Sequence, residues 1–158
     1  MKRSPRNIAI TTDIIVGFCG ETEAEFEETM SLVKEVEYES MFSFKYSPRP
    51  NTPALKLDNH VPEEEKQARL VRLQAMQREI QERCNAPLLG IVEEVMVEGF
   101  NKATEQWIGR TSQNRTLNFT LPDGVAAPVV GNYRHARVTK AGPHSLAGVS
   151  ELVGEMLA

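Results

Sequence analysis

A single strand–helix–strand run at the start of the chain limits its fold more than any other feature. Residues 8–18, IAITTDIIVGF, are rich in β-branched side chains and predict a buried strand. Thr22 and Glu25 have the spacing of a capping box, so a helix is predicted to begin there. Residues 40–46, SMFSFKY, alternate apolar and polar side chains, which predicts a second strand. We therefore expect a βαβ unit whose parallel strands are joined by a right-handed crossover.

One βαβ unit cannot bury a core of its own. Two strands and one helix leave a sheet edge on each side and one face of the sheet uncovered. We therefore expect Met1 to enter midway through a larger α/β domain. In such a fragment Ile15, Phe42 and Phe44 would lack partner strands, and the fragment would fold poorly.

A proline-rich loop and a long helix are expected next. Residues 47–62, SPRPNTPALKLDNHVP, are dense in turn residues and predict an ordered loop. Pro62 followed by three glutamates is typical of a helix N-terminus, and this helix is predicted to run to about Arg83. Its predicted inner face carries Leu70, Leu73, Gln77 and Ile80, and Val71 and Met76 widen this apolar stripe.

The pattern changes to short strands from Leu88 onward. Turn residues separate five runs, at 90–100, 106–111, 115–120, 132–141 and 145–152. Such spacing is typical of a small barrel, and we expect its five strands to be antiparallel. The expected fold class is therefore α/β followed by all-β.

Charge is unevenly distributed along the chain. Its net charge is -4, but residues 99–144 contain six Lys or Arg and two Asp or Glu, a local charge of +4. A polyanion, if one binds, should meet this part of the chain. On charge alone, a solvated face is the favoured interpretation.

Cysteines, histidines and apolar runs exclude several classes of protein. Cys19 and Cys84 are far apart and in no metal-binding spacing, so neither a disulfide framework nor a zinc site is predicted. The three histidines suggest no hydrolytic triad. No apolar run is long enough for a membrane helix, and no secretory signal follows the N-terminus. A reducing cytoplasm fits best.

Three segments are candidates for binding. DIIVGFCGET, residues 13–22, ends a strand in glycines and could approach a nucleotide, although a tight turn is the favoured alternative. Lys45 and Arg49 flank a strand end, where a ligand site and a rigid proline loop are equally supported.

The third segment, GRTSQNRTLNF at 109–119, predicts a hairpin. Its arginines suit phosphates and its asparagines suit base edges. Phe119 could stack on a base, but a place in the core is favoured.

Four motifs together resemble a known family. TTDIIVGFCGET, FSFKYSPRPNTPA, VPEEEKQARLVRLQAMQREI and VEGF…GRTSQNRTLNF occur in the order found in the C-terminal half of radical-SAM methylthiotransferases. The resemblance extends from Ile8 to about Leu152. The last motif is similar to the branch that acts on tRNA dimethylallyladenosine, rather than to relatives that modify a ribosomal protein or threonylcarbamoyladenosine.

The resemblance implies three parts and a reaction. Residues 1–57 would end a radical-SAM partial barrel of TIM type, 58–87 would be a connecting loop and helix, and 88–158 would be a TRAM barrel that binds tRNA. In this family one [4Fe-4S] cluster cleaves S-adenosylmethionine, and the resulting radical abstracts hydrogen from C2 of adenosine 37. A second [4Fe-4S] cluster takes part in sulfur insertion, giving the 2-methylthio product.

The resemblance also implies site residues. Ile15 and Gly17 match the strand that lines the adenosyl pocket, and Arg49 matches a loop at the rim of the substrate site. The implied RNA contacts are Arg110, Asn114, Arg115 and Asn118. Cys19 replaces a usual proline and Asn51 a common glycine, the latter at little cost because asparagine tolerates a left-handed backbone.

The sequence contains no CxxxCxxC motif, so we expect no catalytic residue, no metal ligand and no activity from this chain alone. One hypothesis is a piece of a methylthiotransferase, with a separate chain as one source of the missing half. The alternative is a freestanding TRAM-type RNA-binding module without catalysis. An open reading frame encoding CxxxCxxC upstream of Met1 would favour the first.

Overall fold

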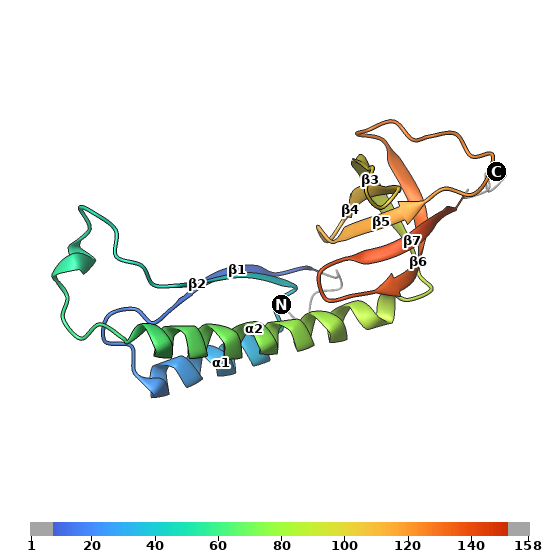
Figure 1. The fold of residues 1–158 in the computed structure, drawn as a ribbon. Helices are drawn as coiled ribbons and strands as arrows, with labels where there is room; N and C mark the ends of the chain where they lie inside the picture. Colours follow the sequence, from blue (N-terminus) through green and yellow to red (C-terminus); the bar gives the residue numbers. More distant parts are fainter. Residues whose placement is uncertain (1–7, 152–158) are drawn as a thin grey trace. The chain divides into compact units, whose positions relative to one another are not determined.

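A computed structural model describes residues 8–151, which divide into two compact units. The α/β unit comprises residues 10–81, and the barrel unit contains Glu82 and the strands that follow it. The elements in chain order (Figure 1) are β1 Thr11–Val16, α1 Glu23–Val36, β2 Ser40–Lys45, the 3₁₀-helix η1 Pro53–Lys56, α2 Glu63–Asn85, the 3₁₀-helix η2 Ala86–Leu88, β3 Val92–Asn101, β4 Gln106–Thr111, β5 Thr116–Thr120, β6 Tyr133–Ala141 and β7 Leu146–Glu151.

The predicted βαβ unit is present. β1 and β2 pair in parallel, from Thr11 opposite Ser40 to Val16 opposite Lys45. The capping box of α1 also forms, because the Thr22 hydroxyl accepts from the Glu25 backbone N–H and the Glu25 carboxylate accepts from that of Thr22 at 2.8 Å. Both backbone groups would otherwise be unsatisfied at a helix start.

Within the described part of the α/β unit, helices cover one face of the β1–β2 pair. Figure 1 shows α1 and α2 on one side of these strands, where Val16 is buried. On the other face Ile15 is 58% exposed, Phe42 66% and Phe44 55%. The prediction of a buried strand is therefore wrong for one face, because successive side chains of a strand point to opposite sides and the helices cover one of them. Among the described residues β1 and β2 pair with each other, and these three side chains are exposed on the face away from the helices.

A buried arginine holds the turn between β1 and α1. Arg69 of α2 is 2% exposed, and its Nη1 lies 2.7 Å from Oε2 of Glu21 and donates to the Glu21 carbonyl at 3.0 Å. The same Oε2 accepts from the Gly17 backbone N–H at 2.6 Å. Glu23 and Glu65 also pair with Arg69, so the buried cation is compensated by carboxylates.

The inner face predicted for α2 is confirmed only in part. Leu73, Gln77 and Ile80 are buried, and Leu70 and Met76 are half-buried. The prediction is wrong for Val71, which is exposed because it lies on the side of the helix away from this face. Lys66 and Arg69, absent from the prediction, are buried as well.

Five strands close the barrel in the order β3-β4-β5-β7-β6, with β6 pairing back to β3. The prediction of an antiparallel barrel is wrong at one place: β5 and β7 are parallel, from Leu117 opposite Leu146 to Thr120 opposite Val149. The physical reason is parity. Strand directions cannot alternate all the way around a closed ring with an odd number of strands, so at least one neighbouring pair must be parallel.

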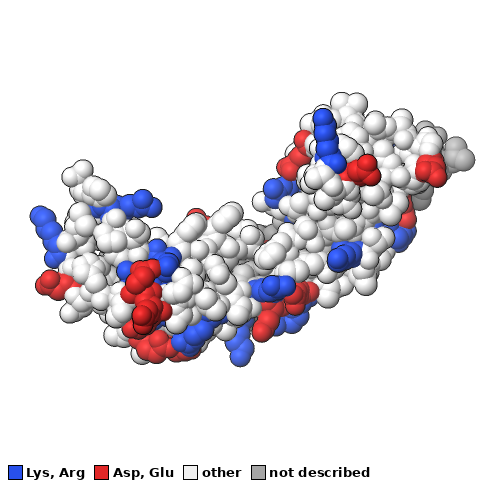
Figure 2. All heavy atoms as spheres, viewed as in Figure 1, with Lys and Arg blue, Asp and Glu red and all other residues white. Residues whose placement is uncertain are grey.

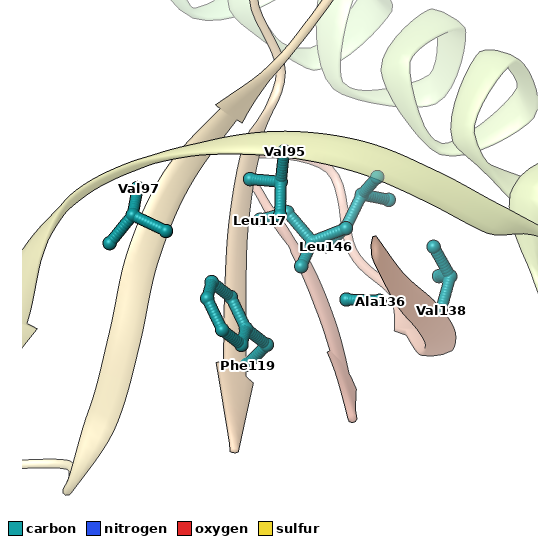
Figure 3. Packing of buried hydrophobic residues seen from close by; sticks show 7 residues of the cluster. All are labelled: Val95, Val97, Leu117, Phe119, Ala136, Val138 and Leu146. Carbon is teal, nitrogen blue, oxygen red and sulfur yellow. The ribbon is translucent and has the colours of Figure 1, made fainter. Parts of the chain in front are cut away.

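Alternate residues of the strands fill the barrel. The buried cluster (Figure 3) consists of Val95, Val97, Leu117, Phe119, Ala136, Val138 and Leu146. Phe119 is fully buried, which confirms that its place is in the core. β4 contributes Gly109 where a larger side chain has no room, because a Cβ there would overlap the Met96 carbonyl oxygen and the Val95 side chain.

We expect Gly109→Ala to destabilise the barrel by about 1–3 kcal/mol, the usual cost of overpacking. Gly99→Ala is the matched control, since a Cβ at Gly99 meets no atom within 4 Å. Urea unfolding followed by the fluorescence of Trp107, the single tryptophan, measures both. Equal stability of the two variants would contradict the close packing at Gly109.

Acid should weaken the contact between α1 and α2. A hydrogen bond from Arg72, 2.6 Å from Oε1, holds the pKa of the Glu23 carboxyl below its ordinary value of 4.5. A lowered folded-state pKa stabilises the fold above the ordinary pKa, and this contribution is lost as the pH falls through the lowered value. The urea midpoint of the helical circular dichroism should therefore fall less steeply with acid in Glu23→Gln. The control, Glu28→Gln at an exposed position on α1, should keep the wild-type slope. If the urea midpoint depended on pH with the same slope in all three proteins, Glu23 would not contribute to the acid sensitivity.

Candidate nucleic-acid interface

The β4–β5 hairpin positions the predicted RNA contacts. The two strands are antiparallel, with Arg110 opposite Thr116 and Ile108 opposite Asn118. Their neighbours Gly109, Thr111, Leu117 and Phe119 are buried. Because side chains alternate along a strand, Arg110, Thr116 and Asn118 lie on the outer surface of the barrel.

A tight turn connects the two strands. The Thr111 N–H donates to the Arg115 carbonyl at 3.0 Å, and the Asn114 N–H donates to the Thr111 carbonyl at 2.9 Å. Asn114 has a left-handed backbone with φ of 61°, which asparagine tolerates better than most residues. Asn114 is exposed at this turn.

The two arginines of the hairpin differ in exposure and contacts. The Arg110 side chain is 41% exposed, its Nε lies 3.3 Å from the Glu98 carboxylate, and its Nη1 donates to the Asn114 carbonyl. Arg115 is half-buried, and its Nη1 donates to Gln113 at 3.5 Å. Arg110 therefore presents the more accessible guanidinium group.

Asn118 lies on the same outer surface but is half-buried. Its Nδ2 donates to the Leu146 carbonyl at 3.5 Å, at the edge of hydrogen-bonding range. The hairpin thus holds the four predicted RNA contacts on one short segment, with Arg110 and Asn118 facing outward from the strands and Asn114 at the turn.

The outer surface also carries two residues that the sequence analysis missed. Met96 of β3 is opposite both Arg110 of β4 and Tyr133 of β6. Alternation within 132–141 groups Tyr133 with outward-facing residues, but the pairing of β3 with β6 joins distant segments and has no local signal. The sequence alone therefore could not place Tyr133 near the hairpin.

The folded barrel does not carry the positive charge of the 99–144 segment. Six Lys or Arg and six Asp or Glu lie between Val92 and Glu151. The added acids come from β3 and β7 and sit among the basic residues, as Glu98 does beside Arg110 and Glu151 beside Arg137. Figure 2 shows acidic and basic side chains interspersed on the face it displays. The surplus of +4 therefore applies to residues 99–144 alone. Acidic residues of β3 and β7 bring the net charge between Val92 and Glu151 to zero.

Residues predicted to line a cofactor pocket lie in the α/β unit. Ile15 is on the open face of the sheet, opposite Phe44. Gly17 has a φ of 74°, and a Cβ there would overlap the Lys66 side chain, so its close approach is to the protein itself. Arg49 is exposed, and its carbonyl accepts from the Thr52 hydroxyl at 2.8 Å.

The turn between β1 and α1 contains a cavity of about 310 Å³ that Ile15, Gly17 and Arg49 do not line. Its lining residues are Phe18, Cys19, Gly20, Glu21, Glu25 and Thr29. Cys19 lies in the turn between β1 and α1, and its sulfur is 3.3 Å from Nδ1 of His60.

A cluster or metal ion does not fit the residues that are described. Among residues 8–151 no three His, Cys, Asp or Glu side chains are grouped to hold a metal ion. Cys19 and Cys84 are the only cysteines of the whole sequence, too few for a [4Fe-4S] cluster held by cysteine thiolates. Within the same range, no helix has the length and apolar character to cross a membrane.

The chain is similar to curated proteins that share one name, although no family model matches it. Curated relatives named tRNA-2-methylthio-N(6)-dimethylallyladenosine synthase include those of Solibacter usitatus, 57% identical over 150 residues, and Koribacter versatilis, 58% identical over 149 residues. The alignments cover 95% and 94% of this chain, but 34% and 33% of those proteins. The relative from Burkholderia thailandensis is 46% identical over 143 residues, 90% of this chain and 31% of that protein.

The chain thus spans about one third of the length of the curated relatives it matches. Identity at this level over nearly the whole chain confirms the resemblance carried by the four motifs. By sequence, the chain belongs to the family of the tRNA-2-methylthio-N(6)-dimethylallyladenosine synthases.

Proposed function

We propose that this chain supplies tRNA binding to a methylthiotransferase that adds a 2-methylthio group to N6-dimethylallyladenosine 37. The names of its relatives support the substrate class. The observation that carries the proposal is the outward-facing hairpin of 109–119, which presents Arg110, Asn114 and Asn118 from a barrel with a closed core. We propose a TRAM-type domain for residues 88–158 and the cytoplasm as its location.

Arg110 would be the principal phosphate contact of the hairpin. A guanidinium group can bind two phosphate oxygens at once, and that of Arg110 already has one acidic neighbour in Glu98. Binding RNA therefore exchanges a protein carboxylate for a phosphate, a smaller gain than adding a phosphate to a free cation. The amides of Asn114 and Asn118 supply donors and acceptors for bases or ribose, and half-buried Arg115 would support the turn.

For the α/β unit we propose a place in the wall of a radical-SAM partial barrel. Parallel strands with their helices on one side are the arrangement of such walls, and the bare side would be the interior. Ile15 faces that side and is the best placed contact for S-adenosylmethionine. Gly17 would shape the turn that follows β1, and Arg49 would lie at the rim of the substrate site.

The chemistry of the complete enzyme would need S-adenosylmethionine and two [4Fe-4S] clusters. This chain has two cysteines and no CxxxCxxC motif, so the cluster ligands would come from residues outside the given sequence. The same observation and the closed core of the barrel favour the alternative, a TRAM-type RNA-binding module without catalytic activity.

We expect the chain to bind tRNA with an affinity that falls as salt rises, because phosphate contacts release counterions. Arg110→Ala should weaken binding to all RNA sequences and reduce the salt slope by about one. Arg110→Lys should keep most of the slope while losing affinity, since lysine retains the charge but not the bidentate geometry. Fluorescence anisotropy with labelled tRNA at several salt concentrations gives both quantities.

Lys34→Ala is the matched control for that experiment. It removes one exposed cation from α1, in the other unit, and should leave affinity and slope unchanged. Wild-type affinity in the double variant Arg110→Ala with Arg115→Ala would exclude the hairpin from the RNA site.

We also expect no iron–sulfur chromophore after anaerobic reconstitution of the purified chain with iron and sulfide. Two cysteines cannot provide the thiolates that such a cluster requires. Visible absorbance and iron analysis measure uptake, with the variant Cys19→Ser, Cys84→Ser as the baseline for adventitious iron. Stoichiometric uptake that both cysteines support would overturn this expectation.

A further inference from the structure

We propose that Tyr133 stacks on an unpaired base, and that the RNA site extends from the hairpin across β3 to β6. This inference rests on the proposed function and names the ligand class of the same site more narrowly, as a single-stranded segment of RNA.

The sheet register places Tyr133 in one row with the hairpin. Tyr133 of β6 is opposite Met96 of β3, Met96 is opposite Arg110 of β4, and Arg110 is opposite Thr116 of β5. Residues directly opposite in antiparallel strands point to the same face. Neighbouring strands lie about 4.8 Å apart, so Tyr133 and Arg110 are separated by about 10 Å.

Alternation shows that this row points outward. Val95 and Val97 on either side of Met96 are buried, as are Ala136 and Val138 further along β6. Tyr133 itself is 63% exposed. A largely exposed aromatic ring on a strand face gives a flat apolar surface on which a base can stack, as single-stranded RNA does on other β-sheet modules.

The backbone that carries Tyr133 is held in place on both sides. The Gly131 N–H donates to the Val97 carbonyl at 2.8 Å, and the Val97 N–H donates to the Asn132 carbonyl at 2.9 Å. Tyr133 then begins β6. The side chain therefore projects from a pre-ordered backbone, so that stacking a base costs little conformational entropy.

Charge alone gives this surface little affinity for a polyanion. Acidic and basic residues are equal in number between Val92 and Glu151, and Glu98 offsets the charge of Arg110. Attraction by the net field of the barrel is therefore small, and a non-ionic contact has to supply part of the affinity. Stacking on an aromatic side chain is such a contact, and it requires an unpaired base, which a loop offers and a duplex does not.

The test compares two RNAs and five proteins, the wild type and four variants. One RNA is a labelled stem–loop with an unpaired anticodon-type loop, and the other is a fully paired duplex of the same length. The variants of the full chain are Tyr133→Ala, Tyr133→Phe and Tyr133→Leu. The control is Leu89→Ala, an equally exposed apolar side chain that precedes the barrel strands.

Tyr133→Ala should weaken stem–loop binding about 5- to 150-fold, the range for the loss of one base stack. Its salt slope should equal that of the wild type, because no phosphate contact is lost. Phenylalanine should restore binding and leucine should not, since stacking needs the flat ring. The Tyr133 variants should bind the duplex like the wild type. Leu89→Ala should bind both RNAs like the wild type. Should Tyr133→Ala lower the urea midpoint, Tyr133→Leu, which keeps an apolar side chain, decides the outcome.

The outcomes separate the two proposals. If the wild type shows no salt-dependent RNA binding, the proposed function fails and this inference fails with it. If the wild type binds and Arg110→Ala weakens binding, but Tyr133→Ala or Tyr133→Leu binds the stem–loop like the wild type, only the stacking role of Tyr133 is overturned.

Discussion

Alternation of side chains around a closed barrel is the constraint on which the candidate site depends. A closed barrel has an inside that must be filled, so Leu117 and Phe119 point inward and their neighbours Thr116 and Asn118 cannot. The same rule turns Arg110 outward next to Gly109. Closure with five strands adds a second constraint, because an odd number requires one parallel pair. Together the two rules determine which side chains a ligand outside the barrel can contact.

The two units satisfy this need for burial to different degrees. The barrel has a continuous core supplied by its own strands (Figure 3). The α/β unit is held on one side, where Arg69 joins Glu21 and the Gly17 backbone to α2. Its other side exposes Phe42 and Phe44. The proposed RNA binding therefore uses only the described barrel residues, whereas the proposed chemistry would need residues beyond them.

Features with local signals could be predicted from the sequence. The capping box of Thr22 and Glu25, the parallel βαβ unit and the five barrel strands follow from patterns within a few tens of residues. β1 was predicted to be a buried strand, but one of its faces is exposed. Its composition does not tell which face the helices cover. The cancellation of charge around Arg110 depends on the pairing of β3 with β4, which places Glu98 beside it. The parallel β5–β7 pair and the burial of Arg69 depend on partners more distant in the chain, such as Glu21. Tyr133 was missed for the same reason.

We propose that RNA binds to the outer face of β3, β4, β5 and β6. Methyl-resolved NMR of the full chain, titrated with the stem–loop RNA, distinguishes this face from the core because methyl groups report on each face separately. We expect the methyl signals of Met96 and Thr116 to shift first, while those of Val138 and Leu146 in the core move little. Shifts confined to Met41 and the other methyl groups of the α/β unit would contradict it.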